Sequence, residues 1–247
     1  GISKDLPPFL SMSLGAGETD LLSLTNAYGM IINGGKKITP TLIDRIQDRR
    51  GVTIFKHDKR NCKNCNGQHT NSKNIPLVAV KDTRKKVISS SSAYQMVSML
   101  KGAIDRGTGI VINSLEKNLA GKTGTTNSNT DAWFIGFSSD LVVGVFVGFD
   151  DPRPLGFKET GSSVAAPIFK EFMKEALLNI PDIPFRRPPG IKLISVNPNS
   201  GLQVSAKDKK SILEAFKPGQ LPNLSFNKNF IDLKNSNTII KNLSPLY

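Results

Sequence analysis

Residues 121–149 read GKTGTTNSNTDAWFIGFSSDLVVGVFVGF, and the fold class follows from this stretch and its flanks. Three runs of strand character occur here in close succession, at 117–125, 132–137 and 141–149. Ser138-Ser139-Asp140 makes a short turn between the last two runs, so we expect them to pair as an antiparallel hairpin. The near-continuous apolar character of 141–149 predicts a strand that is buried on both faces.

Three segments with helical periodicity surround these strands, at 19–33, 90–106 and 162–178. Thr19 or Asp20 is suited to cap the first of these helices. We therefore predict an α/β protein of the α+β type, in which an antiparallel sheet is flanked by helices. The side chains expected to face inward from the second and third helices are Tyr94, Val97, Met99, Leu100, Ala103 and Ile104, and Ala166, Ile168, Phe169, Phe172, Met173 and Leu177.

The remaining segments predict smaller features and the domain organisation. Residues 41–55 indicate a hairpin around Arg49-Arg50-Gly51, residues 57–76 an irregular loop, and residues 191–197 a short strand. The amino-acid composition changes after Pro181, where prolines cluster and asparagines later accumulate. We expect a main domain at 1–180, a Pro-rich linker with a small appendage at 181–222, and a disordered tail at 223–247.

The composition is that of an ordinary globular protein. The 21 glycines and 15 prolines among 247 residues stay well short of the ~25–30% typical of low-complexity chains. A collagen-like chain and a wholly disordered chain are therefore excluded, and two cysteines are too few for a disulfide-dense miniprotein. The longest apolar run, 141–149, is much shorter than the ~20 residues that span a bilayer.

The net charge of +13 comes from 33 basic and 20 acidic side chains. The basic residues are dispersed, with only short groups such as the pairs Lys36-Lys37 and Arg186-Arg187, and no aromatic stacking platform accompanies them. We therefore predict no nucleic-acid partner. A weak and unspecific attraction to an anionic surface is compatible with this charge.

The segment whose residue types point most clearly to a chemical function is Lys122-Thr123-Gly124-Thr125-Thr126. A Lys-Thr-Gly triplet alone is common, and an ordinary strand end is the competing interpretation. Here the triplet ends a strand and precedes a buried hairpin, the context required by serine acyl-transferases that recognise penicillin. The glycine leaves room for a peptide backbone alongside the strand. The Lys122 ammonium adds positive potential, and the hydroxyls of Thr123 and Thr125 can hold a carboxylate.

Further motifs follow one another in a fixed order along about residues 6–220. They are Ser13-Leu14-Gly15, Leu24-Thr25-Asn26-Ala27-Tyr28, Asn33-Gly34-Gly35, Tyr94-Gln95-Met96, Arg106-Gly107-Thr108-Gly109, Gly121 to Gly136, Gly148-Phe149-Asp150-Asp151, Glu159-Thr160-Gly161, Ala165-Ala166-Pro167-Ile168 and Glu214-Ala215-Phe216-Lys217-Pro218-Gly219. Together they resemble the transpeptidase domain of class A high-molecular-weight penicillin-binding proteins of the 1A type. The resemblance implies a β-lactamase-like transpeptidase fold from which the N-terminal part is missing.

The function that this resemblance implies is peptidoglycan synthesis by a bifunctional glycosyltransferase and D,D-transpeptidase. A serine attacks the D-Ala-D-Ala bond of a stem peptide, and an amine from a neighbouring strand resolves the acyl-enzyme into a crosslink. The implied partners are stem peptides, a lipid-linked precursor bound by a further domain, β-lactams and proteins of the cell-wall machinery. The implied location is the periplasmic face of the inner membrane, and no cofactor is expected.

The resemblance also implies three site motifs, Ser-x-x-Lys, Ser-x-Asn and Lys-Thr-Gly, of which we accept only the third in this chain. Ser98 to Lys101 lies within a predicted helix, and Ser114 to Lys117 lies too close to Lys122 to form a separate wall. Ser72-Lys73-Asn74 lies in the loop with the cysteines. We therefore expect the nucleophile and its lysine to precede Gly1, and this chain alone to be inactive.

Roles within the third motif carry over residue by residue. By resemblance, Lys122, Thr123, Gly124 and Thr125 belong to the catalytic site, and Lys122, Thr123, Thr125 and Thr126 contact the substrate. The backbone N–H of Thr125 is expected to donate to the oxyanion. Trp133 is expected to pack in the core beside the strand.

Cys62 and Cys65 lie between the two histidines of the chain, His57 and His69. A small disulfide, a pair of free thiols and a zinc site are all compatible with this spacing. We expect no metal, because His57 precedes the cysteines too closely and a periplasmic setting favours a disulfide.

Two alternative functions stay open at this point. One is a catalytically inert scaffold that binds a peptide or a partner protein. The other is a D,D-carboxypeptidase, in which water rather than an amine resolves the acyl-enzyme.

Overall fold

The computed structural model describes residues 7–60, 62–63 and 79–223. The chain forms two units, 1–189 and 190–247, which are described separately. The predicted boundaries near residues 180 and 222 stay predictions, and nearly all of the predicted tail lies outside the described residues.

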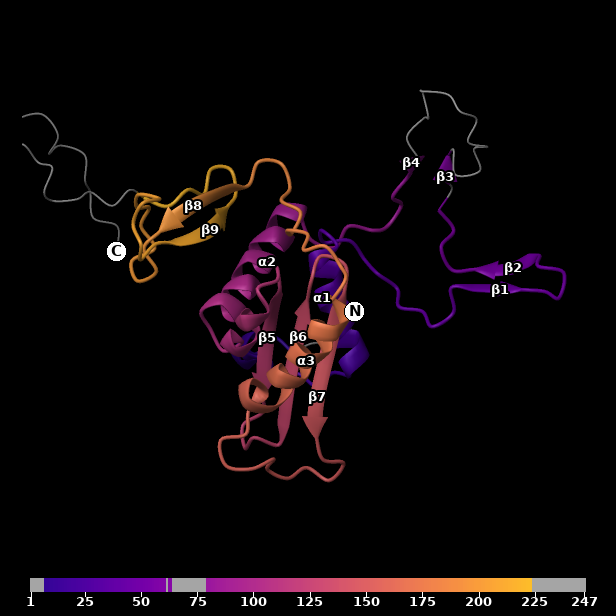
Figure 1. Cartoon of the computed structure of the whole chain (residues 1–247), viewed down its shortest axis with the longest axis horizontal. Coiled ribbons are helices and arrows are strands. Elements are labelled where there is room, and N and C mark those ends of the chain that lie inside the picture. Colours follow the sequence, from indigo (N-terminus) through magenta and orange to yellow (C-terminus); the bar gives the residue numbers. More distant parts are fainter. Residues whose placement is uncertain (1–6, 61, 64–78, 224–247) are drawn as a thin grey trace, which may run out of the picture. The chain divides into compact units, whose positions relative to one another are not determined.

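The centre of the first unit is an antiparallel sheet of three strands (Figure 1). The strands are β5 (Ala120–Thr125), β6 (Asp131–Phe137) and β7 (Val142–Gly148), in the order β5-β6-β7. Lys122 pairs with Ile135, and Ile135 pairs in turn with Gly144. The three predicted strands and their hairpin connection are thus confirmed.

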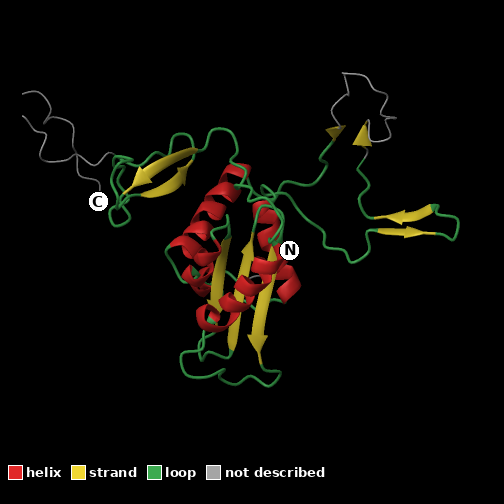
Figure 2. Ribbon diagram, viewed as in Figure 1, coloured by secondary structure: helices red, strands yellow, loops and turns green. Residues whose placement is uncertain are grey.

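Helices cover both faces of this sheet (Figure 2). The helices α1 (Leu21–Ile32) and α2 (Ser90–Asp105) pack on one face, where Phe137 of β6 meets Val97 and Leu100. The π-helical turn η3 (Gly161–Ala165) and the helix α3 (Ala166–Ala176) pack on the other face. There the Phe134 ring lies 4.7 Å from the ring of Phe169, and both side chains are fully buried. The predicted α+β fold is therefore confirmed.

Local capping explains where the first two helices begin. The Asp20 carboxylate accepts the Ser23 N–H at 2.8 Å, and the contact with Ser23 lowers the pKa of Asp20. The Ser89 hydroxyl accepts the Ser92 N–H at 3.0 Å in the same way. A 3-10 turn, η1 (Leu10–Leu14), precedes α1, and another, η2 (Ile110–Leu115), follows α2.

The prediction that the third strand is buried on both faces is wrong. The side chains of β7 are mostly half-exposed, and Phe146 keeps 43% of its surface accessible. The buried strand is β6, because it has a strand on each side and helices on both faces, whereas β7 lies at an edge of the described sheet. Apolar content alone does not distinguish these two positions.

Some side chains expected to face inward are exposed instead. Ile168 and Phe172 are about half-exposed, at 49% and 51%, while Phe169 and Met173 are fully buried. In α3 only a narrow stripe, Ala166, Phe169 and Met173, faces the sheet, and Ile168 and Phe172 lie beside that stripe. Met99 of α2 is also exposed, because the stripe that faces the sheet contains Ala93, Val97, Leu100 and Ile104.

Between α1 and α2 along the chain, the first unit contains a hairpin arm. The strands β1 (Arg45–Gln47) and β2 (Thr53–Lys56) confirm the hairpin predicted at 41–55, with shorter strands. The prediction of an irregular loop at 57–76 holds at 57–60, which contain no helix or strand, and is wrong at Cys62–Lys63. There β3 (Cys62–Lys63) pairs with β4 (Ala79–Val80), because residues beyond the predicted loop provide the partner strand.

The second unit contains one two-stranded sheet, β8 (Lys192–Val196) paired with β9 (Ile212–Phe216). The strand predicted at 191–197 is confirmed. Its partner β9 was not predicted as a strand, and residues 197–211 separate it from β8.

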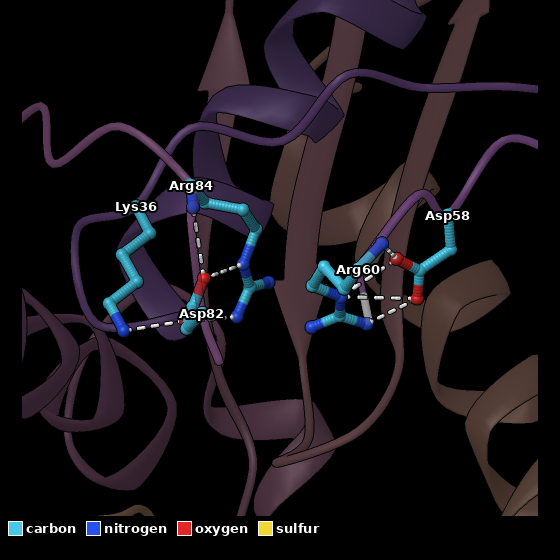
Figure 3. Close-up of polar contacts among 5 residues, drawn as sticks. All are labelled: Lys36, Asp58, Arg60, Asp82 and Arg84. Atoms are coloured by element: carbon cyan, nitrogen blue, oxygen red, sulfur yellow. Dashed lines mark hydrogen bonds and ion pairs between the residues drawn. The ribbon is translucent and has the colours of Figure 1, made fainter. Parts of the chain in front are cut away.

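Two Asp-x-Arg turns stabilise the base of the arm (Figure 3). Asp82 accepts hydrogen bonds from the guanidinium of Arg84 at 2.8 and 2.9 Å, and from Lys36 Nζ at 2.6 Å. Asp58 is held by Arg60 in the same manner, at 2.6 and 2.8 Å. Because Lys36 lies in the segment that follows α1, its contact with Asp82 ties the arm to the helical body.

These cations determine the ionisation of Asp82. Hydrogen bonds from Arg84 and then Lys36 hold the pKa of the Asp82 carboxyl well below its ordinary value. A carboxyl whose pKa is lower in the folded state stabilises the fold above its unfolded pKa, about 3.9, and loses this contribution as the pH falls further. We expect a carboxyl ¹³C NMR titration to place the Asp82 midpoint well below 3.9. Arg84→Gln should raise this midpoint.

The matched control for this titration is Lys37→Met, which removes a neighbouring positive charge but no hydrogen-bond donor to Asp82. It should leave the Asp82 midpoint almost unchanged. A wild-type midpoint at the ordinary value of an aspartate, or equal shifts in both variants, would contradict the contact between Arg84 and Asp82.

Candidate functional site

The candidate site lies along the outer edge of β5, which has a strand neighbour on one side only in the described sheet. The Thr126 N–H donates to the carbonyl of Asp131 at 3.2 Å. The backbone groups of every second residue before Thr126 therefore face β6 as well. Because peptide groups alternate along an edge strand, those of Thr123 and Thr125 face outward. The Lys122 Nζ atom confirms this alternation, since it reaches the carbonyl of Thr123 at 2.9 Å.

Lys122 provides the positive charge of this edge. Its side chain is exposed, and Nζ lies 2.9 Å from the Thr123 carbonyl and 3.3 Å from Thr123 Oγ1. Sequence reasoning placed Lys122 and the Thr123 hydroxyl in one site, and the structure brings them together.

Two hydroxyls of β5, those of Thr123 and Thr125, lie on the face of the strand that η3 covers. Thr125 Oγ1 accepts the N–H of Gly161 at 3.0 Å. Thr123 Oγ1 lies 2.8 Å from the hydroxyl oxygen of Thr108, in the loop after α2. The hydroxyl of Ser162 donates to the carbonyl of Thr108 and so joins η3 to this loop. A hydrogen-bonded network therefore links β5 to two other segments.

A glycine contact allows η3 to approach the strand this closely. A Cβ atom on Gly161 would lie 2.5 Å from the carbonyl oxygen of Trp133 and 2.6 Å from that of Gly124. Both atoms belong to the backbone of the sheet, so they cannot move aside cheaply. Gly124 is restricted as well, because its own Cβ would lie 3.1 Å from Cβ of Trp133.

Thr126 and Trp133 have surroundings that sequence reasoning did not predict. The Thr126 hydroxyl accepts the Asp131 N–H at 2.9 Å and lies 2.7 Å from the Thr130 hydroxyl, so it closes the turn from β5 to β6. Trp133 was expected in the core but is only half-buried, because it lies on the strand beside the edge residue Phe146. The two rings are 4.7 Å apart.

The described serine motifs have the surroundings of structural residues. Ser98 is half-buried within α2, and the nearby Lys101 forms an ion pair with Asp105 at 2.9 Å. The Ser114 hydroxyl donates to the Val111 carbonyl at 3.1 Å within η2. Ser72-Lys73-Asn74 lies outside the described residues.

Thr108 and Ser162 are the site residues that sequence reasoning missed. Thr108 was interpreted only as part of the motif Arg106-Gly107-Thr108-Gly109, with no role in the site. Ser162 was interpreted only as the start of another helix. No pattern of residue types indicates that the Ser162 hydroxyl reaches the Thr108 carbonyl, since Ser162 is 54 residues from Thr108 along the chain.

The cysteine region gives no further site. Cys65 and His69 lie outside the described residues, and the side chain of Cys62 is not described either, so their pairing stays a prediction. Among residues 7–60, 62–63 and 79–223, no group of three or more His, Cys, Asp or Glu side chains is placed to hold a metal ion. No helix in the same ranges is both long enough and apolar enough to cross a membrane.

A cavity of about 570 Å³ lies apart from the β5 edge. It is bounded by the end of α1, the start of α2 and residues 183–189, and none of Lys122 to Thr126 lines it. The five predicted site residues therefore belong to an open strand edge rather than to this cavity.

The β5 edge has three chemical properties that suit a peptide ligand. Outward peptide groups can pair with an extended backbone, as in β-strand addition. An ammonium group and hydroxyls next to them can bind a carboxylate. The outward N–H of Thr125 can donate to an oxygen that gains negative charge.

Comparison with known proteins agrees with these features. Residues 10–174 match the family model of the penicillin binding protein transpeptidase domain. Penicillin-binding protein 1A of Rickettsia conorii is 41% identical over 239 residues, which is 97% of this chain and 30% of that protein. Penicillin-binding protein 1A of Pseudomonas aeruginosa is 32% identical over 251 residues, with 90% and 30% covered. The chain thus spans about 30% of the length of these relatives.

Solved structures show the same likeness. The crystal structure of penicillin-binding protein 1A from Haemophilus influenzae superposes with a TM-score of 0.70 at 31% identity, over 87% of this chain and 34% of the other. PonA1 from Mycobacterium tuberculosis shares the fold with a TM-score of 0.60 at 22% identity, over 75% and 45% of the two chains.

The contact between Thr125 and Gly161 leads to a stability prediction. Thr125→Val keeps the shape of the side chain but leaves the Gly161 N–H without its acceptor, which costs about 1 kcal/mol of unfolding free energy. We expect urea denaturation to show this loss, and amide hydrogen exchange to accelerate at Gly161. Thr125→Ser retains the hydroxyl and should behave as the wild type does. Equal stability of all three proteins would mean that the hydrogen bond contributes nothing.

Proposed function

Because the chain belongs to the family of penicillin-binding protein transpeptidase domains, we propose that it contributes the β5 wall of a D,D-transpeptidase site that crosslinks peptidoglycan stem peptides. In this reaction a serine Oγ attacks the carbonyl carbon of the D-Ala-D-Ala bond and an ester forms. The terminal D-alanine leaves with a proton on its nitrogen. An amine of a second stem peptide then attacks the ester, and the serine recovers its proton.

The observation that carries this proposal is the combination of a cation and hydroxyls with a strand edge that has no partner strand among the described residues. Lys122, Thr123 and Thr125 present these groups within one stretch of β5. A stem peptide that ends in D-Ala-D-Ala offers the complementary groups, namely an extended backbone and a terminal carboxylate. The carboxylate interacts with the Lys122 ammonium and the Thr123 hydroxyl.

The remaining catalytic groups are proposed to come from other parts of a longer protein. In our proposal the Thr125 N–H supplies one donor to the oxyanion, and the N–H of the nucleophile supplies the second. The nucleophilic serine and its lysine would precede this chain, because Ser98 lies within the regular helix α2 and the Ser114 hydroxyl is bonded to the Val111 carbonyl within η2. Thr126 supports the site through the turn that it closes.

Several properties of the parent protein follow from the same proposal. It would be a bifunctional enzyme with an additional peptidoglycan glycosyltransferase domain that binds the lipid-linked precursor. It would be anchored in the inner membrane with the transpeptidase domain in the periplasm, where β-lactams acylate the same serine. The parent protein would bind other proteins of the cell-wall machinery. It would thereby contribute to cell shape, and as a β-lactam target it would be relevant to antibiotic resistance.

Acylation by a fluorescent penicillin tests the role of Lys122. In the parent protein, Lys122→Ala removes the charge that faces the carboxylate, and it should lower the second-order rate constant of acylation at least tenfold, or roughly 1.4 kcal/mol. Lys117→Ala is the matched control, because Lys117 precedes β5 and should be dispensable. Unchanged acylation of Lys122→Ala would remove this residue from the site.

The same reagent distinguishes the parent protein from the 247-residue chain. The parent should be labelled covalently, and the 247-residue chain alone should not. Labelling of this chain at Ser98 or Ser114 would contradict the assignment of both serines as structural. With a stem-peptide substrate, release of D-alanine without a crosslinked product would favour the carboxypeptidase. An unlabelled parent would favour the inert scaffold.

A further inference from the structure

The hydroxyls of Thr108 and Thr123 form a pair whose direction decides what Thr123 can offer a ligand. Their oxygens are 2.8 Å apart, and either can be the donor. A hydroxyl carries one hydrogen, so one O–H of the pair is used for the contact and the other stays free. The Lys122 Nζ atom, 3.3 Å from Thr123 Oγ1, has only hydrogens to donate and therefore accepts none.

A bound carboxylate would determine this direction. It accepts hydrogen bonds only, and bonds to an ionised acceptor are roughly twice as strong as those between neutral groups. The Thr123 O–H therefore turns to the carboxylate, and its oxygen can then accept from Lys122 Nζ and from one further donor. The Thr108 hydroxyl is placed to be that donor, and donors in such a chain strengthen one another.

We propose that Thr108 is a positioning residue, which donates its hydroxyl hydrogen to Thr123 Oγ1 and thereby directs the Thr123 O–H to the carboxylate of the ligand. This assignment rests on the proposed function. It extends the site from the β5 strand to the loop that follows α2.

Ser162 holds Thr108 in place for this role. Its hydroxyl donates to the Thr108 carbonyl, and the neighbouring Gly161 N–H donates to Thr125 Oγ1. The loop after α2 is further held by the Gly109 N–H, which donates to the Ala103 carbonyl at 2.9 Å. Thr108 is exposed, yet its backbone is anchored from η3 and from α2.

Exposure separates a positioning role from a purely structural one. Water competes for a hydroxyl pair at the surface, so its loss has little effect on the stability of the fold. Thr108 is exposed and Thr123 is only half-buried. The effect of removing the Thr108 hydroxyl should therefore appear in carboxylate recognition and not in unfolding.

The test measures acylation of the parent protein by a penicillin with a free carboxylate and by the methyl ester of the same penicillin. Thr108→Val should lower the rate constant for the acid about tenfold and that for the ester less than about twofold, because only the acid uses the directed hydrogen bond. Thr108→Ser should restore the wild-type rate. Thr53→Val, the same change on the exposed strand β2, should have no effect.

A double variant isolates the pair. If Thr108 acts through Thr123, Thr108→Val combined with Thr123→Val should be no slower than Thr123→Val alone. Additive losses, equal losses for acid and ester, or an unchanged rate in Thr108→Val would overturn the assignment while the parent is still acylated. A wild-type parent that is not acylated at all would overturn the proposed function, and this assignment with it.

Discussion

The burial of β6 is the constraint on which the rest of the described structure depends. This strand has β5 and β7 at its two edges and helices on both faces. Phe134 packs against Phe169 of α3. The centre of the Phe137 ring lies 6.4 Å from that of the Tyr28 ring of α1 and 5.6 Å from that of the Phe185 ring. Burial of two large aromatic side chains on opposite faces fixes the register of the strand, because a slip by one residue would exchange the faces.

The rigidity of β6 allows its neighbour β5 to be polar and open. β5 forms the edge next to the buried strand, with Lys122 exposed and Gly124 and Gly161 in close backbone contact. Because η3 approaches the sheet through Gly161, its N–H reaches the Thr125 hydroxyl, and Ser162 reaches the loop of Thr108. The hydroxyls are therefore positioned by a packed scaffold, as precise recognition of a peptide requires.

Sequence reasoning located the three strands, the main helices and the Lys-Thr-Gly segment, because periodicity and turn residues are local signals. It misjudged which strand is buried, since β6 and β7 are both apolar and only the strand order separates them. It also missed the π turn before α3, and it predicted too broad a buried stripe for α3 by including Ile168 and Phe172. Family resemblance extended the interpretation of the β5 residues from chemistry to function.

The sequence by itself determined the three central strands, the main helices and the candidate segment Lys122 to Thr125, because strand alternation and residue chemistry are local properties of the chain. Only the tertiary structure decided that Thr108 and Ser162 belong with this segment. Their contacts join residues 15 and 54 positions apart, through one pair of hydroxyls and one carbonyl. Such contacts depend on how closely η3 and the loop after α2 pack against β5. That distance is determined by the buried aromatic side chains of β6 and by the missing side chain of Gly161.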